Sequence, residues 1–163
     1  MKFKACTKEL KSQRANELGL TLIEIMIAIA LLVIIATIGL VAANPAGQIA
    51  GARNNERQLH LQALMNSIRQ NIADTSGETF TCVAGAIPTT STDMASASGS
   101  YNIAPCIIPA YLFTMPFDPS ASGAHYTSVS DYDTDYTIME NASGVITVAA
   151  PYAELKKSIS ISR

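Results

Sequence analysis

The sequence predicts an α+β protein in which a long N-terminal helix packs on a small C-terminal antiparallel β-sheet. Three patterns lead to this fold class. Residues 20–43 are an apolar run, residues 52–73 repeat apolar side chains at spacings of three and four, and residues 131–138 alternate with period two. The first half of the helix is expected to span a membrane and the second half to be amphipathic.

The composition agrees with a membrane segment joined to a water-exposed part. Of 163 residues, 48% are hydrophobic and only 15% are charged, against roughly 25% charged in an average soluble domain. The net charge of −2 gives no sign of the strongly basic surface typical of nucleic-acid binding, so no nucleic-acid partner is expected. With no Trp, two His and three Cys, the chain does not resemble a metal-rich or disulfide-dense scaffold.

The apolar run is long enough to cross a bilayer. It reads LTLIEIMIAIALLVIIATIGLVAA and carries one charge, Glu24. As a helix it would cover roughly 36 Å, against about 30 Å for the hydrocarbon core. Residues 1–19, which precede it, hold five Lys or Arg and two acids. This excess of basic residues favours an N-terminus inside and a C-terminal part outside.

Three interpretations of this N-terminus are open. A secretory signal cut near Ala43 would have an apolar region of about 7–15 residues, which is shorter than this one. An uncleaved signal anchor explains the length but not Glu24, because an acid inside a span is costly and usually functional. The third starts from Gly19, followed by Leu-Thr-Leu-Ile-Glu and an unbroken apolar segment. This pattern closely resembles the class III leader of type IV prepilins and pseudopilins.

The resemblance implies a processing route. A prepilin peptidase would cut after Gly19 and methylate the new N-terminal amine on Leu20, which stands where the family usually has Phe. Glu24 matches the acid at the fifth mature position, which the family is thought to use in assembly. The chain would be a structural subunit of a type IV pilus or pseudopilus-like filament, polymerised through its N-terminal apolar helix, and not an enzyme.

The resemblance also implies partners and a location. The partners would be identical or related pilin subunits, the prepilin peptidase, the inner-membrane assembly machinery and the lipid bilayer. The chain would cross the cytoplasmic membrane once, with its N-terminus inside, and then enter an extracytoplasmic filament.

Two alternatives to a pilus subunit remain. A type II secretion pseudopilin is one, because Pro116-Phe117-Asp118-Pro119 is similar to the turn before the sheet in major pseudopilins of that system. A membrane-anchored adhesin or competence-type binding module that does not polymerise is the other. Removal of residues 1–19 takes away five of the 11 basic and two of the 13 acidic residues. The mature chain would then carry −5, which disfavours strong contact with nucleic-acid phosphates.

Four segments follow from these patterns: a cleaved basic leader over 1–19, a transmembrane and assembly helix over 20–43, an amphipathic continuation over 44–76, and an extracytoplasmic head over 77–163. The break before the third segment is Asn44-Pro45, because Pro lacks the amide donor that a helix needs. An apolar stripe is expected to face the head, and polar residues are expected on other faces. The stripe is Leu61, Leu64, Met65, Ile68 and Ile72, and the polar residues are Arg57, His60, Asn66 and Arg69.

The head is expected to begin with a surface loop over residues 77–110, which is rich in Thr, Ser, Ala, Gly and Pro. Strands are expected from Tyr111 onward. Residues 131–138 would pair with 145–148 across a turn, and 158–162 would add an edge strand.

The cysteine count changes on cleavage, since Cys6 leaves with the leader. Cys82 and Cys106 then remain on the side of the membrane where thiols oxidise. A disulfide between them is favoured and would stabilise the head by roughly 3–4 kcal/mol. Two unpaired buried thiols are the alternative.

A weak calcium signal lies in the predicted strand. Asp131, Asp133 and Asp135 echo the D-x-D-x-D opening of a calcium loop, and major pseudopilins bind calcium near the C-terminal sheet. Calcium takes six to eight oxygens, of which three acids on one strand face supply only part. A solvated acidic face is therefore preferred, and no cofactor is expected beyond this possibility. His60 and His125 fall in no nucleophile or metal motif, so no catalytic site is predicted.

Overall fold

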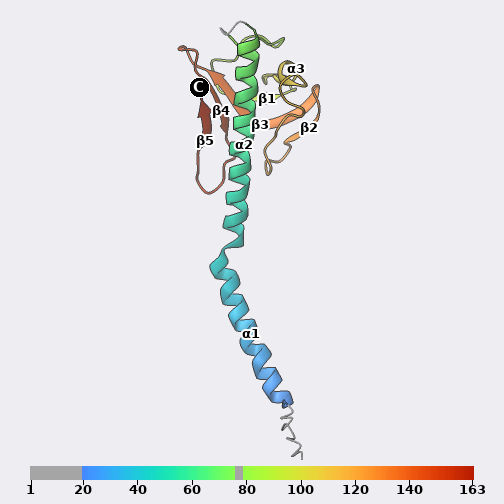
Figure 1. Ribbon diagram of the computed structural model, residues 1–163, viewed down its shortest axis with the longest axis vertical. Coiled ribbons are helices and arrows are strands. Elements are labelled where there is room, and N and C mark those ends of the chain that lie inside the picture. The colour runs from blue at the N-terminus through green and yellow to red at the C-terminus, as the bar shows by residue number, and fades with distance from the viewer. Residues whose placement is uncertain (1–19, 76–78) are drawn as a thin grey trace, which may run out of the picture. The chain divides into compact units, whose positions relative to one another are not determined.

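The computed structural model describes residues 20–75 and 79–163 (Figure 1). They divide into two compact units, with the boundary between Ala43 and Asn44. The first unit contains helix α1 (Leu22–Ala43). The second contains α2 (Pro45–Asp74), β1 (Thr92–Ala95), α3 (Ala104–Ile107), β2 (His125–Ser128), β3 (Asp131–Glu140), β4 (Ile146–Ala150) and β5 (Ile159–Ser162). Helices come first and antiparallel strands follow, so the predicted α+β class is confirmed.

The Asn-Pro pair separates the two long helices. Asn44 has the left-handed backbone angles φ 41° and ψ 62°, which Asn adopts more readily than most residues. Its side-chain oxygen accepts a hydrogen bond from the N–H of Gly47 at 3.3 Å, as an N-cap residue does. Pro45 occupies the first position of α2, where its missing N–H costs nothing. The second helix therefore starts directly after the break, earlier than the apolar pattern from residue 52 indicates.

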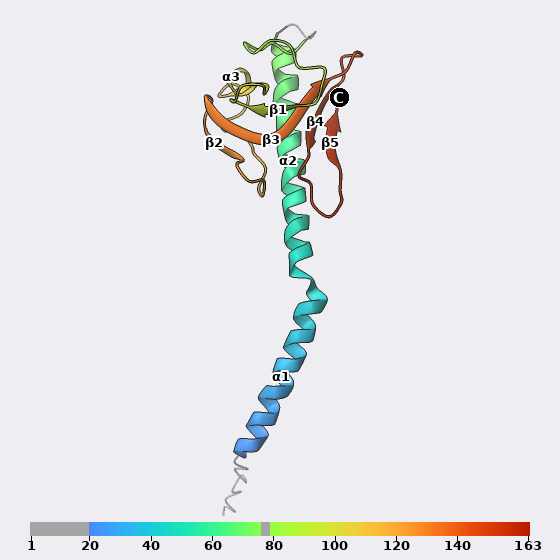
Figure 2. The same ribbon diagram turned by 180° about the vertical axis from the view of Figure 1, so that it is seen from behind.

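The apolar stripe of α2 packs on one face of the sheet (Figures 1 and 2). Leu61, Leu64, Met65 and Ile68 are buried, and Ile72 is partly buried against the same core. These are the positions that the three-and-four spacing predicts. Arg57 does not follow the prediction, because it is fully buried and lies on the packed side of the helix.

The sheet is antiparallel with strand order β1-β3-β4-β5, and β2 also pairs with β3. The turn between β3 and β4 is held by Asn141, whose side-chain oxygen accepts from the N–H groups of Ser143 and Val145 at 2.9 Å each. Gly144 completes the turn with φ 76°, which glycine reaches without steric cost. Along β3 the alternation is as predicted, since Tyr132, Thr134, Tyr136 and Ile138 are buried while the acids between them are at least partly exposed.

The predicted surface loop over 77–110 is wrong for its central part. Strand β1 forms there and pairs with β3, and its Met94 and Ala95 are buried. Helix α3 follows and contributes Ile107 to the core. The expectation of strands from Tyr111 is also wrong, since the next strand begins at His125. Short strands of small residues carry little periodic signal, and what fixes them is pairing with a neighbouring strand.

Candidate functional site

Helix α1 exposes all of its large apolar side chains. From Leu22 to Val41 their exposed fractions run from 46% to 81%. Among the described residues this is the segment long and apolar enough to cross a membrane. An apolar surface of this extent is stable in lipid or against other apolar helices, but not in water.

The first turn of α1 is capped locally. The N–H of Glu24 donates to the carbonyl of Thr21 at 3.0 Å and to its hydroxyl at 3.3 Å. Thr21 and Glu24 thus have the spacing of a capping box, in which Thr at the N-cap is followed three residues later by Glu. An acid in the first turn also interacts favourably with the helix dipole. The backbone N–H of Glu24 is therefore satisfied within one chain, and the role of its carboxylate in assembly stays a prediction.

The predicted cleavage site lies at the edge of the described region. Gly19 falls outside the described residues, and Leu20 is exposed and precedes α1. The role of Leu20 as the first mature residue stays a prediction.

A buried ion-pair network joins α2 to two loops of the head. Nε of Arg57 donates to Oδ2 of Asp118 at 2.6 Å, and Nη2 donates to Oδ1 at 3.0 Å; neither side chain is exposed. Nη2 also donates to the hydroxyl of Ser120 at 2.6 Å. Nη1 donates to Asn54 at 2.8 Å and to Glu154 at 3.1 Å. The five N–H donors of the guanidinium group are therefore matched by five acceptor contacts.

Glu154 fixes the loop between β4 and β5 on α2. Its carboxylate accepts from Nε and Nη2 of Arg53 at 2.8 and 2.7 Å. The Asn54 side chain donates to the carbonyl of Glu154 at 2.8 Å and accepts from its N–H at 2.9 Å. Both the backbone and the side chain of Glu154 are thus bound to the helix.

The members of this network stay ionised at neutral pH. Hydrogen bonds from Arg53 and Arg57 lower the pKa of Glu154 to about 2. Burial raises the pKa of Asp118, but hydrogen bonds from Arg57 and from two backbone N–H groups outweigh it, and the pKa lies below its usual value. The hydrogen bond to Asp118 raises the pKa of Arg57 further.

Sequence reasoning missed this network. Arg57 lies four residues before Leu61, so its position continues the spacing of the buried stripe. This spacing is the pattern that could have predicted the burial of Arg57. A charged residue on an apolar stripe requires a buried partner. The sequence does not show that Asp118 is that partner.

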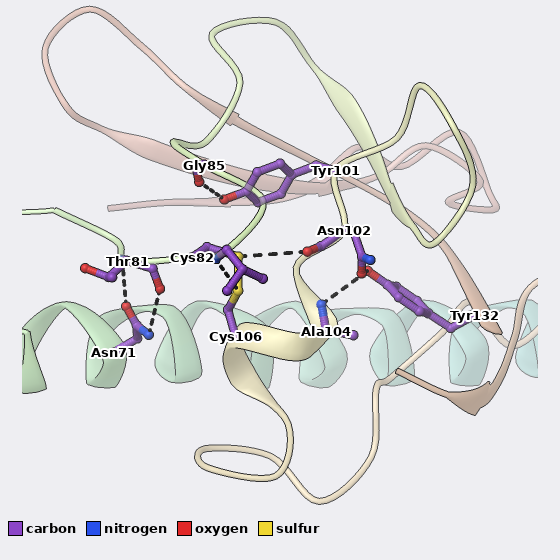
Figure 3. The surroundings of a disulfide bond; sticks show 10 residues. Asn71, Thr81, Cys82, Gly85, Tyr101, Asn102, Ala104, Cys106 and Tyr132 are labelled. Carbon is purple, nitrogen blue, oxygen red and sulfur yellow. Dashed lines mark hydrogen bonds between the residues drawn. A yellow bond between two sulfur atoms is a disulfide. The ribbon is translucent and has the colours of Figure 1, made fainter. Parts of the chain in front are cut away.

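The disulfide joins Cys82 to Cys106, with the two Cα atoms 5.2 Å apart (Figure 3). Hydrogen bonds flank it on both sides. The Asn71 side chain of α2 accepts from the N–H of Thr81 at 2.9 Å and donates to its carbonyl at 3.2 Å. The Tyr132 hydroxyl accepts from the N–H of Ala104 at 3.2 Å. The bond therefore ties the chain after α2 to α3, within the segment that the sequence predicts as a loop.

The three aspartates of β3 do not gather into a cation site. Asp131 is exposed and its Oδ1 lies 3.3 Å from Nε2 of His125. Oδ1 of Asp133 accepts from the N–H of Asp135 at 3.0 Å. No group of three or more His, Cys, Asp or Glu side chains within the described ranges could share a metal ion. Calcium takes six to eight oxygens, so calcium binding by these three residues stays a prediction.

Asp135 is the unusual member of this face. Its backbone is left-handed, with φ 54°, and its Oδ2 is buried without a hydrogen-bond partner among the described residues. Burial, together with the charges of Asp133, Asp118 and Asp93, raises its pKa. The expected solvated face is therefore partly buried at this position.

The two histidines have structural contacts. His60 is partly buried, and its Nδ1 lies 2.9 Å from the hydroxyl of Tyr136; burial lowers its pKa. His125 is exposed, and Nδ1 of its ring contacts the carbonyl of Gly123.

Residues 14–40 match the family model of the prokaryotic N-terminal methylation motif. No curated protein and no solved structure matches the chain. The matched motif is the class III leader of type IV pilins and pseudopilins, which prepilin peptidase recognises. The N-terminal segment is therefore type IV pilin-like or pseudopilin-like, which points to a structural subunit. The leader and the exposed apolar helix together indicate membrane anchoring.

Proposed function

We propose that this chain is the structural subunit of a type IV pilus or pseudopilus-like filament. The precursor is cut between Gly19 and Leu20, the amine of Leu20 is methylated, and subunits polymerise through residues 20–43. The observation that carries the proposal is the methylation motif, whose match over residues 14–40 runs into a helix whose large apolar side chains are all exposed. Lipid covers this surface before assembly, and helices of other subunits cover it afterwards.

The charge distribution supports an orientation with the head outside. The five basic residues of the leader favour the cytoplasmic side for the N-terminus. The disulfide of the head agrees, because such bonds persist in oxidising compartments.

Glu24 would act during assembly. It lies about 6 Å along the helix from Leu20, so in a lone subunit its carboxylate stays near the membrane interface. In a bundle of apolar helices the carboxylate needs a cation, and the amine of Leu20 on a neighbouring subunit lies at a comparable depth. Low dielectric strengthens this attraction, which would select one axial register between subunits.

Processing is tested by mass spectrometry of the membrane and filament fractions from the native cells. The expected N-terminus is N-methylated Leu20. An intact Met1, or a start near Asn44, would contradict the proposal. Electron microscopy with an antibody against the head tests polymerisation, and a processed protein that never forms labelled filaments would indicate an anchored binding module.

The role of Glu24 is tested by Glu24→Ala, with Thr21→Ala as the matched control. Glu24→Ala removes the charge but keeps the N–H that bonds to Thr21, whereas Thr21→Ala removes the capping hydroxyl and keeps the charge. Glu24→Ala is expected to be inserted and cleaved normally and to give few filaments, whereas Thr21→Ala assembles. Equal loss of filaments in both variants would assign the defect to the cap, and an uncleaved Glu24→Ala protein would assign it to processing.

A further inference from the structure

The loop between β4 and β5 presents a compact set of exposed apolar and basic side chains. We call residues 151–158 the basic loop. Tyr152 and Leu155 are 56% and 52% exposed, and Lys156 and Lys157 next to them are exposed as well. An aromatic residue, an aliphatic residue and two lysines within six positions are the residue types that occur where proteins contact the interface of a bilayer.

The basic loop is held in one conformation. Leu155 and Lys156 both have left-handed backbones, with φ 59° and 56°, which side chains other than those of Gly and Asn seldom adopt. Such strain persists where surrounding contacts over-determine it. Here Glu154 supplies them, through Arg53 and through both backbone bonds to Asn54. The exposed side chains are therefore presented by a fixed backbone.

The two lysines of the basic loop are positively charged, whereas the head as a whole has more acidic than basic residues. Over residues 44–163 the chain has six basic and ten acidic residues. Arg53 and Arg57 are engaged by carboxylates of the head. Lys156 and Lys157 form no ion pair with any described residue and are adjacent in the chain. An anionic surface would therefore attract the head through the basic loop and repel its acidic regions.

The place of attachment limits how far along α2 the loop can lie from the end of the apolar segment. Glu154 is bound to residues 53, 54 and 57 of α2, and α2 begins at Pro45, next to the end of the apolar segment. At 1.5 Å per residue these contacts lie about 12–18 Å along the helix from its start. The attachment point of the loop therefore lies no more than about 18 Å from the start of α2, whatever the orientation of α2, because this distance is set by the rise of the helix.

From these observations we infer that the basic loop docks on anionic lipid headgroups of the membrane in which α1 is anchored. Lys156 and Lys157 meet lipid phosphates, while Leu155 and Tyr152 enter the interfacial region. The contact requires that α1 lies in the bilayer, and it does not depend on filament assembly. It would hold the head of an unassembled subunit against the membrane.

Acetylation of lysine amines can report on the basic loop selectively, because the only lysines after residue 19 are Lys156 and Lys157. The full chain is reconstituted in vesicles of phosphatidylcholine alone, or with about one third phosphatidylglycerol, and exposed amines are acetylated with an uncharged reagent. Mass spectrometry separates peptides of the leader from those of the basic loop. An Arg69→Lys variant adds a reference amine at an exposed site further along α2.

Acetylation of Lys156 and Lys157 is expected to slow in the anionic vesicles by roughly fivefold for each lysine, the factor that corresponds to about 1 kcal/mol. The reference amine introduced by Arg69→Lys should react equally in both lipids. Salt near 1 M, where the Debye length is about 3 Å, should abolish the difference. Leu155→Asn, which tolerates the left-handed backbone, should weaken the protection without removing a lysine.

Equal reaction in both lipids, or a chain that does not float with the vesicles, would overturn the inference. Protection that follows the number of chains per vesicle and not the anionic lipid would assign the basic loop to a second copy of the chain, and would also overturn it. Protection in a protein that never forms filaments would leave this inference standing and count only against the proposed polymerisation.

Discussion

Replacing Arg57 with Met is expected to destabilise the head severely. The substitution keeps a long apolar side chain on the buried stripe but removes all five hydrogen bonds of the guanidinium group. Asp118 would then remain fully buried, with the N–H groups of Ser120 and Ala121 at 2.8 and 2.9 Å and the Ser120 hydroxyl at 3.4 Å to solvate its charge. Breaking a buried ion pair by removing one partner typically costs about 3–5 kcal/mol.

This cost is large beside the roughly 5–15 kcal/mol that stabilises an ordinary domain. It can be measured on the full chain in detergent by urea unfolding. The chain has six Tyr and no Trp, and all six tyrosines lie beyond residue 100, so near-ultraviolet circular dichroism reports on the head alone. With a slope of about 1.5–2 kcal/mol per M, the midpoint should fall by roughly 2 M.

Two further variants test whether the loss of stability comes from the buried pair of Arg57 and Asp118. Arg57→Met combined with Asp118→Leu removes both buried charges, and it should be more stable than the sum of the single changes predicts. Arg53→Met removes a partly exposed partner of Glu154 and should cost much less. A loss below about 1 kcal/mol for Arg57→Met, or strict additivity in the double variant, would show that the buried pair is not the source of the stability.

Three other outcomes are expected from the same unfolding assay. Replacing Cys82 and Cys106 with Ala should cost about 3 kcal/mol, because the bond closes a loop with a sequence separation of 24; an unchanged midpoint would mean that this loop is already ordered in the unfolded chain. Asp135→Asn should stabilise the head at pH 7 by roughly 0.5–1 kcal/mol, since burial and neighbouring acids raise the pKa of Asp135 and disfavour its charge. Burial holds the pKa of His60 below 6.5, so its contribution is complete above that pH and is lost as the pH falls through the folded-state pKa. His60→Gln should flatten the pH dependence below 6.5, and a profile identical to that of the wild type would assign it to other groups.

Much of the fold could be predicted from local patterns. The apolar run of α1, the stripe from Leu61 to Ile68 and the alternation along β3 each repeat a spacing that one type of secondary structure requires. The Asn-Pro break could be placed because Pro45 lacks a donor whatever its surroundings. Strand β1 could not, since Met94 is the one large apolar residue in its four positions and the pairing with β3 supplies the rest.

Some residues of the candidate site could be predicted from the sequence, and others could not. Gly19, Leu20 and Glu24 could be predicted from the sequence because the leader is a linear motif, and a membrane span depends on composition and length and not on packing. The buried network of Arg57, Asp118 and Glu154 joins residues 61 and 97 positions apart, and no local pattern encodes such a pairing. The same holds for the basic loop, whose left-handed backbone depends on contacts between Glu154 and α2. The sequence by itself predicted the leader and the span and determined the fold class, because a linear motif, the composition of a segment and short-range periodicity need no tertiary contacts. Tertiary structure alone decided which charges are buried and which are left exposed, because desolvation and pairing depend on groups brought together only when the chain folds.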